Sequence, residues 1–450
     1  MKNFFRHHLA AGITFVSLAL CGLPPALAAG MVPKRVVLDN GLILLTSEQR
    51  ALPMVSIELL IDAGSRLDGA NQEGLANLTA RLLTYGTKQK NALQISDTLD
   101  FLGASLSTGC GDDLASISMT ILKKDLATGL NLLAEILTTS TFPAEEIERQ
   151  KQSVIAALQA REEEPGDVAQ RRFAALLYPN SPYGRPAEGN EKSVRALTQK
   201  GLRDFFERNY RPNRTIMAVV GDISQDEIAK QLNQAFRAWN KGTPGTKPQA
   251  PAQIGAPQTA RINKALTQAN IILGHQGLGR ENPDYYAVQV MNYILGGGDF
   301  SSRAMESIRN QRGLAYSVYS YFGAEKGYGT FEFVMQTKNE TALEAVRLAE
   351  DEMRRMREQP VSEQELKDAK DFLTGSFPLR FDTNSKVANF LAQVEYYEIG
   401  LDYVERYNGL IEKITREDVQ RVAQKYLLPD KVITVIVANQ SKVAEKNPPK

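Results

Sequence analysis

Apolar and polar positions follow two different periods along this chain, and the two periods predict a mixture of strands and helices. Short, nearly continuous apolar runs predict strands, and longer segments with apolar residues every three or four positions predict helices. Strands and helices come in clusters without strict alternation, which favours an α+β fold with helices on one face of each sheet. In the first half we expect strands at 55–61 and 215–220 and helices at 73–83, 96–102, 125–137 and 144–160. In the second half we expect strands at 271–273, 328–335 and 432–438 and helices at 285–295, 341–357 and 362–373.

Two passages of the first half recur in the second half at nearly one offset. A Thr that can cap a helix, a Pro that ends the helix and an apolar strand follow one another from Thr198, and again from Thr415, 217 residues later. The segments 143–151 and 362–370 resemble each other at an offset of 219 residues. We therefore expect a duplicated chain with two homologous domains, each a mainly antiparallel sheet with helices packed on it.

The composition changes between the two copies. Residues 239–258 are rich in Pro, Gly, Ala and polar residues and lack apolar periodicity, as is typical of a semi-extended linker. This linker divides the chain into an N-terminal domain, 30–238, and a C-terminal domain, 259–450.

The N-terminus predicts export. Lys2 and Arg6 precede an apolar run at 9–23, and Ala26-Leu27-Ala28 has the pattern of a cleavage site, so residues 1–29 are interpreted as a secretory signal peptide. A membrane anchor is the alternative, but the run is shorter than the roughly 20 residues that span a bilayer. We expect an exported, periplasmic protein with no membrane span after cleavage.

Charge and composition exclude several classes of function. The 450 residues include 53 Lys and Arg against 52 Asp and Glu, which removes the basic surface expected of a nucleic-acid-binding protein. There are three His and two Cys, and signal cleavage would leave only His275 and Cys110. We expect His275 to be structural or on the surface, and Cys110 to be a small packed side chain. Zinc needs three or four suitable ligands, so this chain lacks a usual set.

One segment of the first half carries a family resemblance. The sequence GLANLTARLLTYGT at 74–87 resembles the active-site helix of the insulinase/pitrilysin zinc peptidases, particularly the short processing-peptidase type. Active members carry H-x-x-E-H there, and the corresponding positions here are Asn77, Ala80 and Arg81. The family's third zinc ligand, a Glu, falls at Ala156 or Ala157. The resemblance therefore implies a degenerate, non-catalytic site and no cofactor in this chain.

A second resemblance lies at 292–319, which is similar to the family's glycine-rich loop, helix and R-G-L-A-Y-S strand. Gly296, Gly297 and Gly298 form the loop, and Arg309 and Tyr316 keep the family's seven-residue spacing. In the family, this Arg and Tyr reach a substrate at the zinc of the facing half or subunit. Residue type alone also allows structural roles, since a helix-end Arg complements the dipole and a strand Tyr often packs. The glycines could be a helix stop or a flexible loop that admits a peptide backbone.

The resemblance covers nearly the whole mature chain and implies a clamshell of two domains in the processing-peptidase-like fold. We expect a non-catalytic, substrate-binding subunit of a periplasmic heteromeric zinc peptidase. A sister subunit with an intact H-x-x-E-H motif would hold the zinc, and the substrate would be a peptide. The alternative is a peptide-binding, scaffold or chaperone protein without a role in proteolysis. A third hypothesis, an independently active enzyme, is the least favoured of the three.

Overall fold

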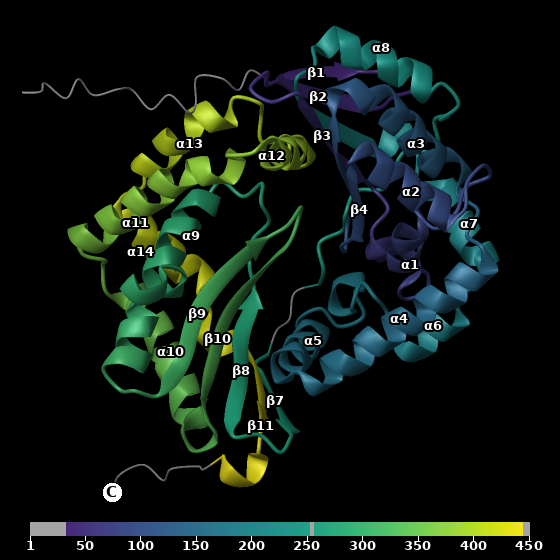
Figure 1. Ribbon diagram of the computed structural model, residues 1–450. Coiled ribbons are helices and arrows are strands. Elements are labelled where there is room, and N and C mark those ends of the chain that lie inside the picture. The colour runs from purple at the N-terminus through teal and green to yellow at the C-terminus, as the bar shows by residue number, and fades with distance from the viewer. Residues whose placement is uncertain (1–32, 253–255, 444–450) are drawn as a thin grey trace, which may run out of the picture.

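The computed structural model describes residues 33–252 and 256–443, which form two sheets with many helices (Figure 1). The mixed α+β fold class and its two-domain arrangement agree with the expectation. The predicted signal peptide lies outside the described residues. The strands are β1 Lys34–Val37, β2 Ile43–Glu48, β3 Met54–Ile61, β4 Ser105–Cys110, β5 Ala115–Leu122, β6 Thr215–Gly221, β7 Gln258–Asn263, β8 Gln268–Gln276, β9 Ala315–Ala324, β10 Gly329–Lys338 and β11 Ile433–Ala438. The α-helices are α1 Leu75–Leu82, α2 Ala92–Leu102, α3 Leu126–Thr139, α4 Ala144–Glu163, α5 Pro165–Leu177, α6 Glu191–Ala196, α7 Gln199–Asn209, α8 Gln225–Ala235, α9 Tyr285–Asn292, α10 Ala342–Glu358, α11 Glu363–Ser376, α12 Asn384–Tyr396, α13 Tyr403–Glu412 and α14 Arg416–Tyr426.

The two sheets share one topology. The first has the strand order β1-β2-β6-β3-β5-β4 and the second β7-β11-β8-β10-β9, so the five strands β2 to β6 correspond in order to β7 to β11. Within each sheet one pair is parallel, β2 with β6 and β7 with β11, and the other pairs are antiparallel. The repeated sequence passages therefore correspond to a repeated fold.

The threonines and prolines of the repeated passages begin and end helices as predicted. The hydroxyl of Thr198 accepts a hydrogen bond from the Gly201 N–H at the start of α7, and Thr415 caps α14 in the same way. Both helices end shortly before a Pro, and a buried strand follows each Pro. These caps and stops position β6 and β11 beside the centre of each sheet.

Each half has its own apolar core between its sheet and the helices on the outer face. The first core draws on β3, β5, α1 and α3, and the second on β8, β10, α9 and α10. Burial of this apolar surface is the main stabilising contribution to each half.

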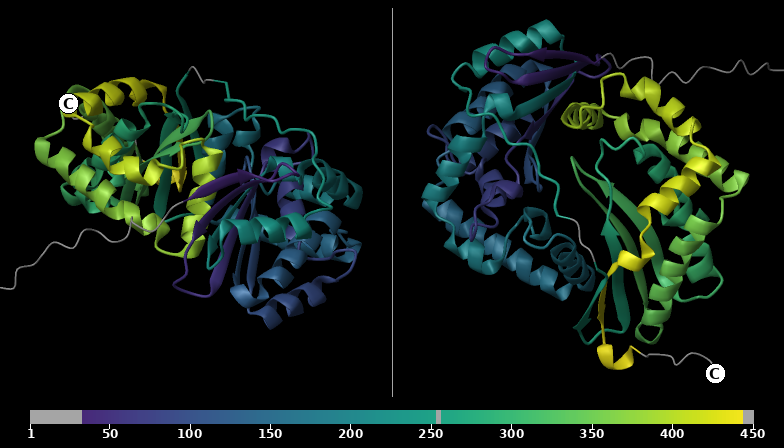
Figure 2. Two further views of the ribbon diagram at one scale, coloured as in Figure 1. Left: turned by 90° about the horizontal axis from the view of Figure 1, so that it is seen from above. Right: turned by 180° about the vertical axis from the view of Figure 1, so that it is seen from behind.

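The inner faces of the sheets are covered too, which differs from the expectation of helices on one face only. Helix α12 of the C-terminal half packs on β3 and β6 of the N-terminal sheet, with Leu391 and Ala388 against Leu60 and Ala218. Helix α5 of the N-terminal half packs on β8 and β11 (Figures 1 and 2), and its Phe173 belongs to the same buried apolar cluster as Ile272. The two helices begin at Pro165 and Asn384, at the 219-residue offset of the repeat. The halves therefore exchange equivalent helices.

The segment expected as a linker is shorter than its predicted bounds. Trp239 is 2% exposed, lies in the first core and donates from its indole N–H to the Tyr210 carbonyl, 3.0 Å away. Gln258 already belongs to β7. We call residues 240–252 the strap. It lies on the N-terminal half, where Gly242 and the Asn213 side chain exchange two hydrogen bonds. Burial of a large aromatic side chain is more favourable than its exposure in a solvated linker. Trp239 therefore belongs to the N-terminal core, and the linker begins after it.

None of the helices within 33–252 and 256–443 is long and apolar enough to cross a bilayer.

Candidate functional site

Helix α1 carries the degenerate positions. Asp68 fixes its start, because the carboxylate accepts hydrogen bonds from the N–H groups of Gly74 and Ala76, both at 2.8 Å. Gly74 has φ +92°, and a Cβ there would lie 2.5 Å from the Glu188 carbonyl oxygen, so the helix begins at a glycine. Asn77 is partly buried, Ala80 is fully buried and Arg81 is exposed.

These residues do not fit a zinc ion. Helix α4 packs beside α1, and its Ala156 and Ala157 are exposed methyl groups without a donor atom. Asn77 offers one amide oxygen, Ala80 none, and Arg81 a cation that would repel the metal. No group of three or more His, Cys, Asp or Glu side chains that could hold a metal occurs within the described ranges. The fold therefore retains the two helices of the family site without its ligand chemistry.

The glycine-rich segment is a tight packing feature and not a simple open loop. Tyr293–Gly297 forms a π-helical turn directly after α9, so the expected helix 285–295 ends as an α-helix at Asn292. Gly296 is buried, and a Cβ there would lie 2.6 Å from both the backbone N and the Oγ of Ser320 in β9. Gly297 is exposed and Gly298 partly exposed. The turn therefore needs glycine at 296 to approach the strand.

Arg309 and Tyr316 lie on either side of the turn that leads into β9. Arg309 is in a π-helical turn, Met305–Asn310, partly buried, with its guanidinium carbon 5.1 Å from the centre of the Phe300 ring. The next strand starts after Gly313, which has φ +62°. These positions agree with the expected order of glycine-rich loop, helix and strand, with a π-helical turn as the helix.

Tyr316 has an unusual backbone setting. Ala315 pairs with Thr337 and Ser317 with Gln336, so Tyr316 is the extra residue of a β-bulge. Its side chain is 72% exposed at the start of the edge strand β9, next to the exposed Tyr319 and Tyr321 of the same strand. A β-bulge interrupts the regular alternation of buried and exposed side chains along a strand. The bulge in β9 points the phenol of Tyr316 into solvent.

His275 and Cys110 have structural roles, as expected. His275 is 3% exposed; its Nε2 accepts from the Leu428 N–H and its Nδ1 lies 2.9 Å from the Gln276 carbonyl oxygen. Burial lowers the pKa of His275 to about 4, so the ring is neutral. Burial raises the pKa of the Cys110 thiol, which keeps it protonated and unreactive.

The structure brings together a cavity that the sequence did not reveal. About 460 Å³ in volume, it lies where the tips of the β4–β5 and β9–β10 hairpins meet α5 and the end of α12. Its titratable lining consists of carboxylates and phenols from both halves: Asp112, Asp113, Glu325, Glu332, Tyr178, Tyr183, Tyr321, Tyr328, Tyr396 and Tyr397.

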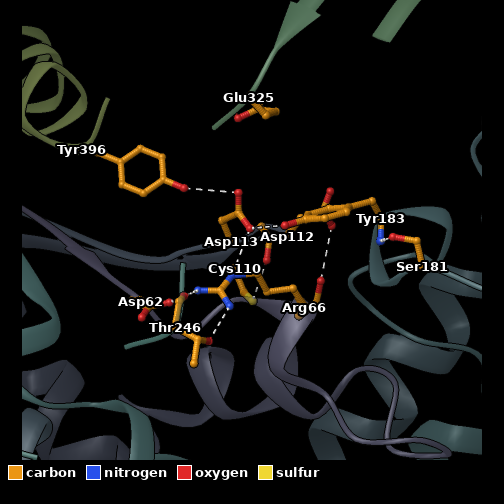
Figure 3. Close-up of polar contacts among 12 residues, drawn as sticks. Asp62, Arg66, Cys110, Asp112, Asp113, Ser181, Tyr183, Thr246, Glu325 and Tyr396 are labelled. Atoms are coloured by element: carbon orange, nitrogen blue, oxygen red, sulfur yellow. Dashed lines mark hydrogen bonds and ion pairs between the residues drawn. The ribbon is translucent and has the colours of Figure 1, made fainter. Parts of the chain in front are cut away.

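Asp113 is the centre of its hydrogen-bond network (Figure 3). It accepts from the hydroxyl of Tyr183 at 2.9 Å and from that of Tyr396 at 3.2 Å, and Arg66 Nε lies 3.1 Å from it. Arg66 is also paired with Asp62 and donates to the Thr246 carbonyl oxygen of the strap at 2.9 Å. Arg66 therefore contacts both the cavity and the strap.

Burial controls the electrostatics of this cavity. Burial, and then repulsion by Asp113, raises the pKa of Asp112 to about 6, and burial likewise raises the pKa values of Asp113 and Glu325. Burial raises the pKa of Tyr178 to about 12, so this phenol is a hydrogen-bond donor at neutral pH. Among the described residues, the lining of this cavity offers donors and acceptors to a polar ligand but no nucleophile–base pair.

Only part of this cavity had a signal in the sequence. Tyr183 stands in the YGRP segment at 183–186, which fits the family resemblance. Asp113 and Tyr396 are 283 residues apart and belong to different halves, and no local pattern indicates that α12 would cross to the other sheet.

Known proteins that resemble this chain belong to the family that the sequence indicated. Residues 44–191 match the insulinase family, peptidase family M16, and residues 196–373 match the family described as the peptidase M16 inactive domain. An uncharacterized zinc protease of Streptomyces coelicolor is 26% identical over 92% of this chain and 91% of its own length. A protein of Helicobacter pylori named a non-peptidase homolog is 28% identical over 95% of this chain and 99% of its own length.

Solved structures show the same architecture. A crystal structure from Pseudomonas fluorescens, described as a peptidase M16 inactive domain, superposes with a TM-score of 0.86 at 30% identity, over 91% of this chain and 98% of that one. A protease from Helicobacter pylori has the same fold at a TM-score of 0.83 and 20% identity, over 91% and 99% of the two chains.

Proposed function

Because this chain belongs to the insulinase family of M16 peptidases as an inactive homologue, we propose that it is the substrate-binding subunit of a periplasmic heteromeric zinc peptidase. In this proposal it supplies Arg309 and Tyr316 to the active site of a sister subunit. That subunit carries the intact H-x-x-E-H motif and the zinc.

The exposed, bulged Tyr316 is the observation that carries the proposal. A phenol placed in solvent by a bulge has no packing role that would explain its position. Attack on a peptide carbonyl builds negative charge on its oxygen, and a phenol hydroxyl aimed at that oxygen donates a hydrogen bond that strengthens in the transition state.

Arg309 supports the same role from the neighbouring turn. Its partners among the described residues are the Phe300 ring and Met305 Sδ, which lies 3.7 Å from Nη1, and not a carboxylate. A guanidinium held by an aromatic ring and a thioether keeps its strong donors for a substrate carbonyl or carboxylate. We expect Arg309 to anchor the peptide and Tyr316 to act in the chemical step.

The test is steady-state peptide cleavage by the chain reconstituted with its zinc-bearing partner. Tyr316→Phe should lower kcat by roughly 100-fold to 1000-fold, and Arg309→Ala should raise KM as well as lower kcat. Tyr319→Phe is the matched control, because this phenol is also exposed on β9 at 47% but stands in regular strand pairing. Size-exclusion chromatography shows whether each variant still assembles.

A second candidate function is a peptide-binding scaffold or chaperone without a role in proteolysis. The replacement of each catalytic group on α1 supports it, and so does the name of the Helicobacter relative. If Tyr316→Phe and Arg309→Ala assemble normally and cleave at the wild-type rate, this second function replaces the first. In both cases we expect the isolated chain to cleave no peptide, and elemental analysis that finds one tightly held zinc per chain would contradict both.

A further inference from the structure

A second cavity, of about 560 Å³, lies between the strap and the C-terminal half, and Tyr397 lines both this cavity and the one around Asp113. Its charged lining consists of four cations and two carboxylates: Lys247, Arg280, Lys326, Arg406, Glu281 and Glu398. A cavity of this size falls in the range of small-molecule sites.

Arg280 is the unusual member of this lining. Its guanidinium carbon lies 3.7 Å from the centre of the Tyr285 ring and within 5.6 Å of the Tyr403 ring, and Nη2 lies 3.1 Å from the Tyr403 hydroxyl oxygen. Its polar side-chain partners among the described residues are phenols, and none of them is a carboxylate. A guanidinium carries five N–H donors, and those not bonded to Tyr403 and Tyr286 are left for a ligand.

The other charges of the lining are largely neutralised within the protein. Lys326 donates to Glu398 at 2.7 Å, and Arg406 is paired with Asp402 at 2.7 Å. Glu281 accepts a hydrogen bond from the Gly327 N–H and keeps its negative charge. Against it stand two cations, Arg280 and the exposed Lys247 of the strap, so the cavity has an excess of one positive charge.

Much of the remaining wall is apolar. Tyr286, Pro248, Pro283 and Ile399 line the same space, and Asn282 and the hydroxyl of Tyr397 add polar groups to it. Glu398, with φ +56°, is the left-handed residue that ends α12, where the Ile399 N–H donates to the Val394 carbonyl oxygen at 3.0 Å. A cation at one end and rings and aliphatic groups around it suit a ligand with an anionic head and an apolar body.

We infer that this cavity binds a small organic anion whose carboxylate or phosphate group pairs with Arg280 and whose apolar part packs on Tyr286, Pro248 and Ile399. Because Lys247 and Pro248 belong to the strap, the ligand would also hold the strap against the C-terminal half. The inference does not depend on the proposed role in proteolysis.

The test is isothermal titration of the full chain with three probes. N-acetylphenylalanine carries a carboxylate and an apolar ring, N-acetylphenylalaninamide is its uncharged match, and inorganic phosphate carries the oxyanion alone. We expect the carboxylate to bind at least about tenfold more tightly than the amide, since a charge-assisted pair contributes more than a neutral hydrogen bond. Phosphate should bind more weakly than the carboxylate probe, because it has no apolar part to pack on Tyr286, Pro248 and Ile399.

Two variants test the assignment of the residues. Arg280→Gln should weaken carboxylate binding at least about tenfold, with folding checked by circular dichroism. Lys247→Met lies on the exposed strap, does not disturb the core and should weaken binding severalfold. Hydrogen exchange in residues 240–252 should slow when the carboxylate probe is bound.

Three outcomes would overturn the inference: no binding of any probe at about 10 mM, where even very weak complexes form; equal binding of acid and amide; or binding unchanged in both Arg280→Gln and Lys247→Met. If Arg280→Gln does not fold, Lys247→Met and the exchange measurement decide the question.

Discussion

At the scale of single residues, burial of carboxylates is the feature with the clearest measurable effect. Asp112 lies in the cavity between the halves, where Ser65 donates to it at 3.3 Å and where Asp113, Glu325 and Glu188 repel its charge. Its pKa of about 6 is higher than the usual value of an unfolded Asp, so the folded chain binds more protons than the unfolded chain between about pH 4 and pH 6.

This difference predicts a pH-dependent stability. The contribution of Asp112 to the free energy of unfolding is largest in acid and falls as the pH rises from about 4 to about 6, because the unfolded carboxyl ionises first. Asp112→Asn should therefore flatten the decline of the thermal midpoint over this range, as measured by calorimetry at several pH values. Asp39→Asn, on the exposed turn after β1, is the control; an equal flattening in both variants would contradict the assignment.

At the scale of elements, the contact of the π-helical turn with β9 positions the proposed active residues. Ser320 Oγ and Asn292 Oδ1 lie 2.7 Å apart, and Asn292 donates to the Ser320 carbonyl oxygen, so the turn and the strand are held together beside Gly296. The hydroxyl of Thr337 donates to the Leu314 carbonyl oxygen at 2.5 Å and supports the bulge at Tyr316 from the neighbouring strand.

Gly296→Ala should destabilise the fold by about 1–3 kcal/mol, because the new methyl group meets the backbone of Ser320. Gly375→Ala is the matched control: it lies in α11 with nothing within 4 Å of the new Cβ, and should stabilise by roughly 0.5–1 kcal/mol. Urea unfolding measures both. A Gly296→Ala variant as stable as the natural chain would show that the turn can move away from β9.

At the scale of the whole molecule, the exchanged helices join the halves more firmly than a linker could. The tertiary contacts of α12 with β3 and β6, and of α5 with β8 and β11, bury apolar side chains of both halves in shared clusters. Arg35 and Glu395 add an ion pair across the junction at 2.9 Å. An opening motion about the strap would have to expose both clusters.

A chain cut by a protease within the strap should therefore elute as one particle in size-exclusion chromatography. Leu391→Ala should weaken this association, since it removes a fully buried side chain of α12 from the N-terminal sheet at a cost of about 2–5 kcal/mol. Leu379→Ala, 64% exposed in the same half, is the control. Fragments that separate without any substitution would show that the shared clusters do not hold the halves together.

The sequence by itself determined the α+β class, the duplication and the degenerate helix, because these depend on local signals. Helix caps such as Thr198 and Thr415, apolar periods and the residue types at Asn77, Ala80 and Arg81 can be read without knowing what packs on them. The order of glycine-rich loop, helix and strand around Arg309 and Tyr316 was predictable from the resemblance of this segment to the family. The predicted signal peptide and partner remain predictions.

Only the tertiary structure decided how the two copies meet. Helices α5 and α12 have apolar faces that indicate burial but not against which sheet, so their exchange could not be predicted. The exchange brings Tyr396 to Asp113, and the course of the strap brings Lys247 near Arg280, across long stretches of chain. Burial and charge pairing act between neighbours in space, and for these residues the neighbours are set by the packing of one half on the other.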